Sequence, residues 1–484
     1  MKMMIDSTWT DAADGAVREV TNPADGAVID TVPSSTIPDI EKAVAAAVKA
    51  RDRMARTPAH ERARILIACA AELDTRNEEL ARLLAQENGK PIRQTREEIT
   101  AAARIFRGFG EEAKRIFGKS ASLDMVPGME RHFAITVRRP VGVVAAIVPF
   151  NYPVELYAHK AAAALAGGNP VVVKPPSACP LTLLKIAEIL ENLGLPRAGH
   201  QVVTGPGETI GDFLAETHDV QLISVTGSTA VGRRISRLAA ESLKRVHLEL
   251  GGNDAGIVCL DADLERVAEA VILGRLARGN GQICCAMKRI FVASERSDEF
   301  AEILSSRATA LKTGNPLEED TDVGPLITEN AAMSVESDIN DAVEKGARIH
   351  TGGKRHGAYI APTVLSGVPP TARMLTDETF GPVMPIVPFG TIDEAITMAN
   401  NSVYGLQAAV FTRDLPTALD VAYRMDAGGV IVNWSSAVRL ENLPFGGVKL
   451  TGHGRESIHD TLNDMTEQKT ILMHDALSVF DSGA

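Results

Sequence analysis

From residue 141 onward, short apolar runs alternate with helix-length segments, and this alternation constrains the fold more than any other feature. Residues 141–148 form a continuous apolar run, as in a strand buried on both faces. Similar runs follow at 171–174, 201–204, 222–226 and 246–250. Strands that alternate with helices of about 10–15 residues are typical of βαβ units with a parallel sheet. The sequence therefore predicts an α/β fold.

Beyond residue 263 the alternation starts again, which predicts a second α/β unit. Its expected helices are 264–277 and 298–311, and its expected strands are 290–293, 383–389, 408–412 and 430–433. The boundary between the two units is expected near Gly251-Gly252.

The remaining segments have sequence patterns that differ from those of these two units. Residues 1–37 read as short strands and turns, and residues 38–117 have helical periodicity with many i,i+4 charge pairs. Residues 122–139 alternate polar and apolar around Pro127-Gly128, which predicts a β-hairpin arm too isolated to bury its own faces. We expect a subunit contact there. Residues 471–473 can form one more strand.

Composition excludes several classes of partner. The net charge of −12 argues against nucleic acid or an anionic membrane. No apolar run reaches the roughly 18 residues of a membrane helix, and the N-terminus turns polar too soon for a signal peptide. The five cysteines have no framework spacing, so we expect a cytoplasmic protein. The eleven histidines show no metal-ligand spacing, so no metal is expected.

Two adjacent cysteines, Cys284 and Cys285, stand in a loop punctuated by Gly279 and Gly281. A cysteine attacks as its thiolate, which N–H groups at a tight turn favour. A lone cysteine in an apolar run is more often a packing residue. Because glycines and Gln282 surround this pair, we predict a nucleophile. A disulfide between neighbours does not fit bridge geometry.

Polar residues follow several predicted strands, at the sheet edge where ligands of parallel sheets bind. Lys174 closes a buried strand and can reach a phosphate or a ribose. The turns at Gly205 to Gly207 and at Gly227 connect a strand to a helix and leave N–H groups free for a phosphate. Neither turn has the spacing of a P-loop or of the dinucleotide fingerprint, so a plain turn remains the alternative.

Two further side chains have properties that catalysis needs. Glu249 lies between Leu248 and Leu250, where burial raises a carboxyl pKa toward neutrality, as suits a general base. A structural salt bridge is the alternative. Asn151 follows an apolar strand, and its amide can donate to an oxyanion or serve as a helix cap.

Over about residues 21–470 the chain resembles the aldehyde dehydrogenase superfamily. The resemblance rests on several motifs in order, each weak alone: Pro149-Phe150-Asn151, Val173-Lys174-Pro175, Thr226-Gly227-Ser228-Thr229, Leu248-Glu249-Leu250-Gly251-Gly252, Gly281-Gln282-Ile283-Cys284, Glu378-Thr379-Phe380-Gly381-Pro382 and Pro444-Phe445-Gly446-Gly447.

The resemblance implies roles for these residues. The cysteine matching Cys284 attacks the aldehyde, the asparagine matching Asn151 helps to hold the oxyanion, and the glutamate matching Glu249 activates water to hydrolyse the thioester. NAD or NADP is the implied cofactor. The implied cofactor-binding residues are Pro149, Phe150, Lys174, Ser177, Gly207, Gly227, Ser228, Glu378 and Phe380.

The resemblance also implies three parts and an assembly. These are a Rossmann-type cofactor domain (1–120 and 141–251), an α/β catalytic domain (252–463) and a small β oligomerisation arm (121–140 and 464–484). A homodimer or homotetramer is expected. Ser177 stands where many NAD-preferring members carry a glutamate, so we expect NADP to be tolerated.

Within the superfamily, the sequence around His159 and Arg439 is most similar to that of lactaldehyde dehydrogenases. The resemblance puts His159 on the tunnel wall and Arg439 at its mouth, with Arg107 facing the same space. Pairing of Arg439 with Glu441 or another acid is the alternative. Relatives that oxidise anionic aldehydes often carry an arginine where Ile283 stands. We therefore predict a small neutral hydroxyaldehyde such as lactaldehyde or glycolaldehyde, with an anionic aldehyde (phosphonoacetaldehyde, sulfonated or semialdehyde type) as the alternative.

Two rivals to a hydrolytic, NAD(P)-dependent aldehyde dehydrogenase remain. One is a CoA-acylating dehydrogenase, which does not need the glutamate. The other is a non-catalytic protein on the same fold. The presence of Cys284, Glu249 and Asn151 together argues against both.

Overall fold

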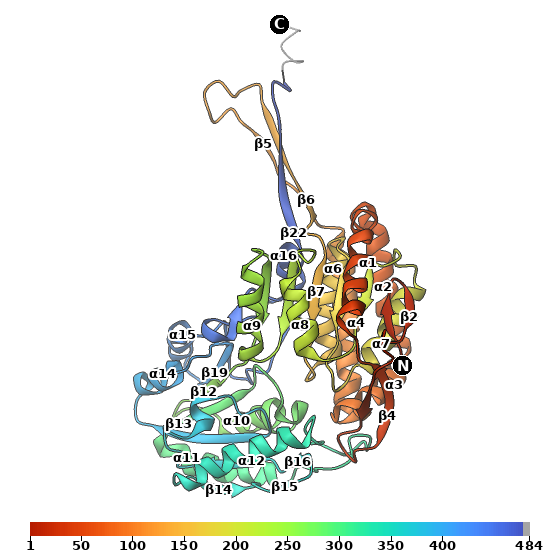
Figure 1. Ribbon diagram of the computed structural model, residues 1–484. Helices are drawn as coiled ribbons and strands as arrows, with labels where there is room; N and C mark the ends of the chain where they lie inside the picture. The colour runs from red at the N-terminus through yellow and green to blue at the C-terminus, as the bar shows by residue number, and fades with distance from the viewer. Residues whose placement is uncertain (478–484) are drawn as a thin grey trace.

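Two large β-sheets, each flanked by helices, and a long projecting arm make up residues 1–477, which the computed structural model describes (Figure 1). Both sheets are parallel in their central strands. The predicted α/β class is confirmed.

The first sheet has the strand order β2-β1-β9-β8-β7-β10-β11-β21. Its five central strands agree with the predicted ones to within a few residues: β7 (Val144–Ile147), β8 (Val171–Lys174), β9 (His200–Val202), β10 (Leu222–Thr226) and β11 (Arg245–Glu249). Alternate residues of β7 enter different hydrophobic clusters, so that Val144 and Ala146 pack on one face while Ala145 and Ile147 pack on the other. The predicted burial on both faces is therefore confirmed.

The edges of this sheet are antiparallel and come from distant parts of the chain. They are β1 (Met3–Ile5) with β2 (Thr8–Thr10) on one side and β21 (Gly452–His453) on the other. Near them, β3 (Val17–Thr21) and β4 (Val28–Pro33) form a hairpin. The predicted domain boundaries stay a prediction; the chain returns to the first sheet at β21, ahead of residue 463.

The helical segment expected at 38–117 is confirmed as four helices: α1 (Ile37–Arg56), α2 (Ala59–Thr75), α3 (Asn77–Asn88) and α4 (Ile92–Ala113). The connections between the parallel strands are α5 (Pro153–Tyr157), the π-helical turn η1 (Ala158–Ala162), α6 (Ala163–Ala166), α7 (Leu181–Asn192), α8 (Gly207–Glu216) and α9 (Thr229–Ala240).

The second sheet has the order β14-β17-β18-β13-β12-β19-β20. Its strands are β12 (Asp254–Val258), β13 (Met287–Ala293), β14 (Arg348–Thr351), β17 (Thr363–Ser366), β18 (Val383–Phe389), β19 (Gln407–Phe411) and β20 (Gly429–Val432). Its longer helices are α10 (Leu264–Val271), α11 (Ser297–Thr309), α12 (Glu329–Glu344), α14 (Ile392–Asn400) and α15 (Leu415–Arg424). Strands β12, β14 and β17 were not predicted. Asp254 and Gly256 interrupt the apolar pattern of β12, although the whole strand is buried.

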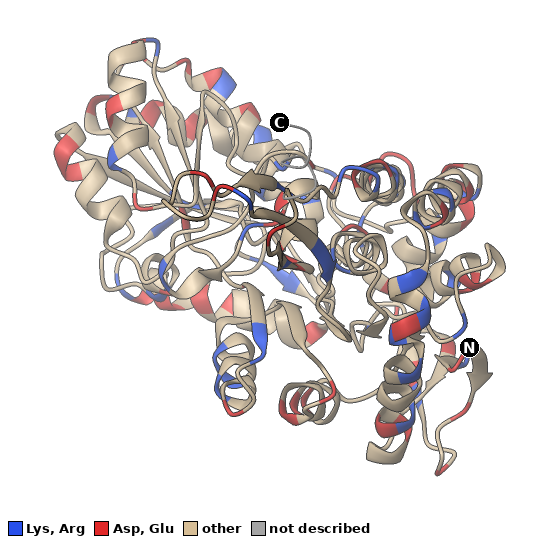
Figure 2. Ribbon diagram, turned by 90° about the horizontal axis from the view of Figure 1, so that it is seen from above, with Lys and Arg blue, Asp and Glu red and all other residues tan. Residues whose placement is uncertain are grey.

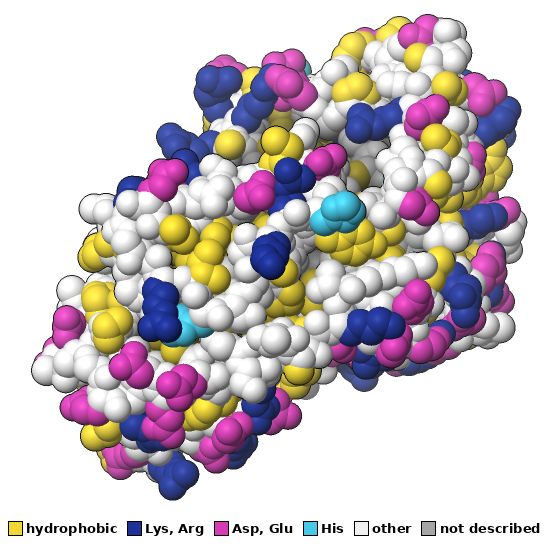
Figure 3. Space-filling model, turned by 90° about the horizontal axis from the view of Figure 1, so that it is seen from below, with side chains coloured by type: hydrophobic (Ala, Val, Ile, Leu, Met, Phe, Trp, Pro, Cys, Tyr) yellow, Lys and Arg dark blue, Asp and Glu magenta, His cyan; other side chains and the backbone are white. Residues whose placement is uncertain are grey.

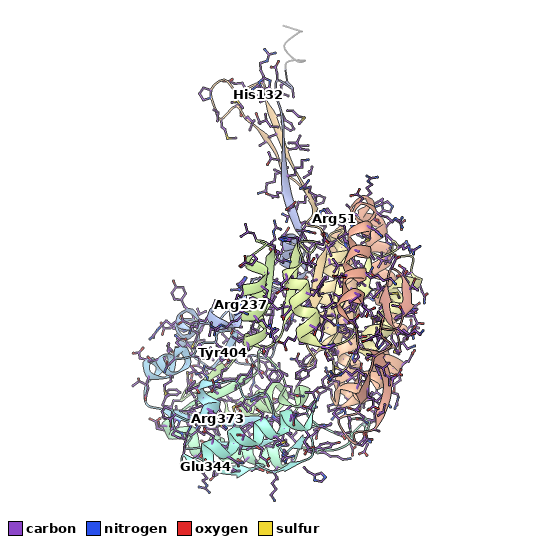
Figure 4. The ribbon with its side chains drawn as sticks, in the orientation of Figure 1. Arg51, His132, Arg237, Glu344, Arg373 and Tyr404 are labelled. Carbon is purple, nitrogen blue, oxygen red and sulfur yellow. The ribbon has the colours of Figure 1, made fainter. Side chains whose placement is uncertain are left out.

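The arm is a three-stranded sheet in which β6 (Phe133–Pro140) lies between β5 (Ser120–Ser122) and β22 (Thr466–Met473). It projects from the rest of the molecule, and His132 lies near its far end (Figures 1 and 4). The predicted hairpin and the predicted C-terminal strand thus belong to one sheet. Residues 478–484 of the predicted arm lie outside the described residues.

Lys, Arg, Asp and Glu residues recur along the helices that surround the sheets (Figure 2). On the face seen from below, both signs of charge are interspersed with apolar side chains (Figure 3). Among residues 1–477, no helix is long and apolar enough to cross a membrane.

Candidate active site

The cysteine loop begins with three consecutive residues in the left-handed region. Gly279, Asn280 and Gly281 have φ values of 58°, 53° and 74°. A side chain at Gly281 would collide with the backbone of Gly381 and Pro382. Only glycine therefore allows this close approach between the loop and the segment that precedes β18.

Buried polar side chains hold the loop in this shape. Asn280 donates to the carbonyls of Gly89 (3.0 Å) and Pro325 (2.8 Å). Arg275, which is fully buried, donates to the carbonyls of Gly281, Thr379 and Val383 at 2.8–2.9 Å. These hydrogen bonds tie the cysteine loop to the backbone around it. The loop is therefore held in one shape before a ligand binds.

The two thiols of the loop interact with each other. Cys284 is partly exposed and Cys285 is buried, and both line the same cavity. A hydrogen bond between them raises the pKa of Cys284 and lowers that of Cys285 to about 7. Because the proton can lie on either sulfur, the pair loses its first proton more easily than an isolated buried thiol does. The more exposed sulfur, that of Cys284, is better placed to attack a ligand.

Asn151 lies against this loop, as an oxyanion donor must. Its side-chain amide donates to the carbonyl of Gln282 at 3.0 Å, and its own carbonyl accepts from Lys90 at 2.8 Å. An amide nitrogen carries two hydrogens, so one N–H of Asn151 remains for a ligand in the cavity that Asn151 and Cys284 both line.

Glu249 ends β11 and is buried behind this cavity. Neither of its carboxylate oxygens has a hydrogen-bond partner in residues 1–477. Burial, followed by the negative charge of Glu456, raises its pKa well above the usual range. A side chain at Gly446 would approach Glu249 Oε1 to 2.9 Å, so the glycine leaves open space beside the carboxylate. This space can admit a water molecule to the carboxylate, and the alternative for Glu249, a structural salt bridge, is not found within residues 1–477.

A buried ionic cluster of Lys160, Arg439 and Glu456 acts electrostatically on Glu249. Glu456 accepts from Lys160 at 2.6 Å and from Arg439 at 2.8 Å, and the carboxylate and the ammonium are fully buried. Burial alone would raise the pKa of Glu456, but the charges of Lys160 and Arg439 outweigh it and hold that pKa well below the usual range. Arg439 therefore pairs with an acid, as the alternative for this residue expected, but the acid is Glu456 and not Glu441.

The cavity that contains both thiols has a volume of about 90 Å³. His159 lies on its wall as predicted, and Arg439 and Phe445 line it together, with the guanidinium carbon 4.5 Å from the ring centre. Neither ring nitrogen of His159 has a protein partner within residues 1–477. Burial, followed by the charge of Arg439, lowers the pKa of His159 well below its usual value, so a neutral imidazole faces the ligand space.

The prediction for Arg107 is wrong. Arg107 pairs with Asp74 at 2.8 Å and does not line the cavity with Cys284. Arg104, one helical turn earlier on α4, lines it instead and pairs with Glu441 at 2.8 Å. The two arginines differ by about 60° around the helix axis, which is enough to turn one toward the cavity and the other toward α2.

Arg278 is a second cavity arginine, besides Arg104, that the sequence analysis did not identify. It lies six residues before Cys284, borders the cavity, and donates to the carbonyl of Ala437 at 3.2 Å. Among the described residues it has no carboxylate within ion-pairing distance, although Glu155 lines the same cavity. The sequence places Arg278 directly before Gly279, at the start of the cysteine loop, but no motif assigns a role to an arginine at that position.

The predicted cofactor residues gather at the carboxyl edge of the first sheet. Lys174, Gly207 and Gly227 line one cavity of about 310 Å³. Lys174 is buried, which lowers its pKa to about 8, and its Nζ donates to Ser177 Oγ at 3.1 Å. A buried ammonium with one protein partner beside a helix start fits the hydroxyl and phosphate groups of a dinucleotide.

The other predicted cofactor residues border this edge. Phe150 and Phe380 come from opposite units and meet edge to face with their ring centres 5.9 Å apart, next to Pro149. Ser228 caps α9 by accepting from the N–H of Val231 at 3.3 Å. Glu378 accepts from the N–H of Gly252 at 3.2 Å. Both units therefore contribute predicted cofactor residues, with Phe150 from the first and Phe380 and Glu378 from the second.

Residues 9–471 match the aldehyde dehydrogenase family. The chain is 43% identical to a 3-sulfolactaldehyde dehydrogenase of Priestia megaterium, over 91% of both chains. It is 37% identical to a lactaldehyde dehydrogenase of Methanocaldococcus jannaschii, over 97% of this chain and all of the relative (100%). Among solved structures, succinate-semialdehyde dehydrogenase from Burkholderia pseudomallei superposes with a TM-score of 0.95 at 37% identity, over 98% of both chains.

Proposed function

The chain belongs to the aldehyde dehydrogenase family, and we propose that it oxidises a small aldehyde with an anionic far end to the carboxylate by a hydrolytic route. It is an NAD(P)-dependent enzyme, as the family is. When bound, the nicotinamide cofactor supplies a hydride acceptor. The observation that carries the substrate proposal is the unpaired guanidinium of Arg278 at the cavity that contains Cys284.

In the proposed reaction, the thiolate of Cys284 attacks the aldehyde carbon and forms a thiohemiacetal. The free N–H of Asn151 stabilises the negative charge that develops on the oxygen, because that amide is already held by the carbonyl of Gln282. Loss of hydride then leaves a thioester on Cys284.

Hydrolysis of this thioester needs a base, and we assign that role to Glu249. Its unpartnered, buried carboxylate and its raised pKa suit proton abstraction from water near neutral pH. This favours hydrolysis over transfer of the acyl group to CoA. The presence of Cys284 and Asn151 on one cavity wall, together with the buried carboxylate of Glu249, likewise disfavours a non-catalytic role.

The wall of the cavity supports an anionic substrate over the neutral hydroxyaldehyde that the sequence alone favoured. Arg104 and Arg439 already have carboxylate partners, whereas Arg278 does not. A sulfonate or carboxylate at the far end of a short aldehyde can pair with Arg278, and the neutral ring of His159 can bond a hydroxyl along the way. A long alkyl chain would leave these donors unpaired.

The test compares kcat/KM for 3-sulfolactaldehyde, succinic semialdehyde, lactaldehyde and hexanal in the parent and in Arg278→Met. We expect the anionic aldehydes to be best in the parent. Arg278→Met should lower their kcat/KM by roughly 10–100-fold, the value of one charged hydrogen bond, and change that of lactaldehyde by less than about threefold.

Arg107→Met is the matched control, because Arg107 lies on the same face of the molecule but outside the cavity. It should leave all four substrates unchanged. If lactaldehyde is the best substrate of the parent, or if Arg278→Met affects it as much as the anions, the neutral hydroxyaldehyde is the better assignment.

We further propose that the arm of β5, β6 and β22 forms the subunit contact of a homodimer or homotetramer. Its apolar residues Ile471 and Leu472 are 39% and 51% exposed in the single chain. Sedimentation of the parent, and of a form with Ile471 and Leu472 changed to Ser, tests the contact.

We also propose a cytoplasmic location, because all five cysteines are free thiols, which fits a reducing compartment.

A further inference from the structure

Lys288 is the second residue of β13, and its side chain is fully buried. Its ammonium donates to the carbonyl oxygen of Cys284 at 2.5 Å and lies 3.3 Å from Oε1 of Glu378. Burying an ammonium is costly unless it is paired and hydrogen-bonded. These two contacts join the proposed nucleophile to Glu378, a predicted cofactor-binding residue.

The other end of this link is more accessible. The side chain of Glu378 is 19% exposed, and its Oε1 also accepts from the N–H of Gly252. A side chain at Gly252 would come within 2.8 Å of the carbonyl oxygen of Cys284, and one at Gly251 would collide with Glu378. The carboxylate and the cysteine peptide therefore converge on the glycine pair at the junction of the two units.

The charges around Cys284 come from several elements. Beyond the hydrogen bond with Cys285 and burial, which raise the pKa of Cys284, the charge of Lys288 lowers that pKa and the charge of Glu378 raises it. Asp254 on β12 also interacts with the charge of Lys288, which lowers the pKa of Asp254, whereas burial raises that pKa well above the usual range. Lys288 and Glu378 thus act on the thiol with opposite sign.

We propose that Lys288 is a positioning residue that couples occupancy of the cofactor site at Glu378 to the placement and reactivity of Cys284. When a ribose hydroxyl donates to Glu378, the carboxylate shares less of its charge with Lys288. The ammonium then acts more fully on the peptide and sulfur of Cys284. This coupling rests on the proposed role of Cys284 but not on the identity of the aldehyde.

The experiment follows alkylation of Cys284 by iodoacetamide against pH, with and without saturating NAD or NADP, with the labelled cysteine identified by peptide mass analysis. In the parent, cofactor should speed alkylation at pH 7. In Lys288→Met, the cofactor effect should fall below about twofold and the alkylation midpoint should move to higher pH, because a nearby cation is lost. Lys288→Arg, which keeps the charge, should restore most of the cofactor effect.

Glu378→Gln should shift the alkylation midpoint in the direction opposite to Lys288→Met. Removal of the negative charge should move the alkylation midpoint to lower pH, and the cofactor effect should again be lost. This variant decides the question alone if Lys288→Met does not fold, since Glu378 is partly exposed. Lys312→Met, which removes a surface lysine paired with Glu318 and Asp320, should match the parent.

The coupling is refuted if Lys288→Met, or Glu378→Gln where that variant alone folds, keeps both the parental midpoint and the parental cofactor effect. Because alkylation needs no aldehyde, this outcome differs from a wrong substrate. A parent whose label falls on Cys285 with full loss of turnover would instead overturn the nucleophile assignment.

Discussion

The guanidinium of Arg439 is fixed by Glu456 at 2.8 Å while it faces the cavity that contains Cys284. Glu456 is fixed in turn by Lys160 at 2.6 Å, so the cavity wall is continuous with a buried ionic cluster. Arg104 also pairs with a glutamate at that wall, but its side chain is 56% exposed against 13% for Arg439. Arg439 is therefore ordered before a ligand arrives, which reduces the ordering cost of binding.

This difference predicts unequal effects on stability. Arg439→Met leaves a buried carboxylate with one cation instead of two, so the free energy of unfolding should fall by roughly 3 kcal/mol. Arg104→Met breaks an exposed pair and should cost less than about 1 kcal/mol. Unfolding in urea at fixed protein concentration measures both. Equal losses for the two variants would show that the buried cluster contributes no more than the surface pair.

Much of the fold could be predicted because local pattern and tertiary environment agree. Strands β8 and β10 are short, mainly apolar runs, and their predicted bounds match the structure. Strand β12 shows where the pattern fails, since Asp254 and Gly256 are polar or small for tertiary reasons. Asp254 accepts from the N–H of Gln407, and a side chain at Gly256 would clash with Met287.

The site shows the same limit. Asn151, Glu249 and Cys284 stand out in the sequence because each follows a strand or a glycine turn. Lys160 and Glu456 are 296 residues apart and have no shared spacing, so only the folded chain brings them together. Arg104 and Arg107 lie on one helix, and the sequence does not fix the rotation of that helix about its axis, so it does not tell which of them faces the cavity.

The first prediction for catalysis concerns the thiol pair. Cys284→Ala should abolish turnover, because the exposed sulfur is lost. Cys285→Ala should keep most of it and move the pH midpoint of Cys284 alkylation to lower pH, since the hydrogen bond with Cys285, which raises the pKa of Cys284, is gone. Steady-state rates and alkylation against pH measure both effects. An inactive Cys285→Ala with an active Cys284→Ala would reverse the assignment.

Glu249 should limit the rate at acid pH. Its pKa is raised by burial and then by the charge of Glu456, so the base is lost as pH falls through this raised value. Glu249→Gln should form the thioester, give a burst of reduced cofactor and then slow by about 10²–10⁴-fold. Glu456→Gln removes the neighbouring negative charge and should move the acid limb to lower pH.

Glu441→Gln is the control for that shift, since Glu441 pairs with Arg104 at the cavity wall. It should leave the acid limb in place. A Glu249→Gln enzyme with parental turnover and no burst would remove Glu249 from the mechanism.

The last prediction concerns the choice between NAD and NADP. Ser177 accepts from Lys174 at 3.1 Å and donates to the carbonyl of Gly205 at 2.9 Å, so a small neutral group stands beside the buried ammonium. No carboxylate at this position repels a 2′-phosphate, and the parent should favour NAD by less than about 10³-fold in kcat/KM, roughly 4 kcal/mol.

Ser177→Glu should restore that repulsion and lower kcat/KM for NADP by tenfold or more relative to NAD, whereas Ser177→Ala should change the ratio little. Lys174 adds a pH signature. Because burial lowers its pKa to about 8, its charge is present below that pH and is lost above it. The KM for NADP should therefore rise above pH 8 more steeply than the KM for NAD. A parent that rejects NADP by more than about 10³-fold at pH 7, with no change in Ser177→Glu, would show that other residues set the preference.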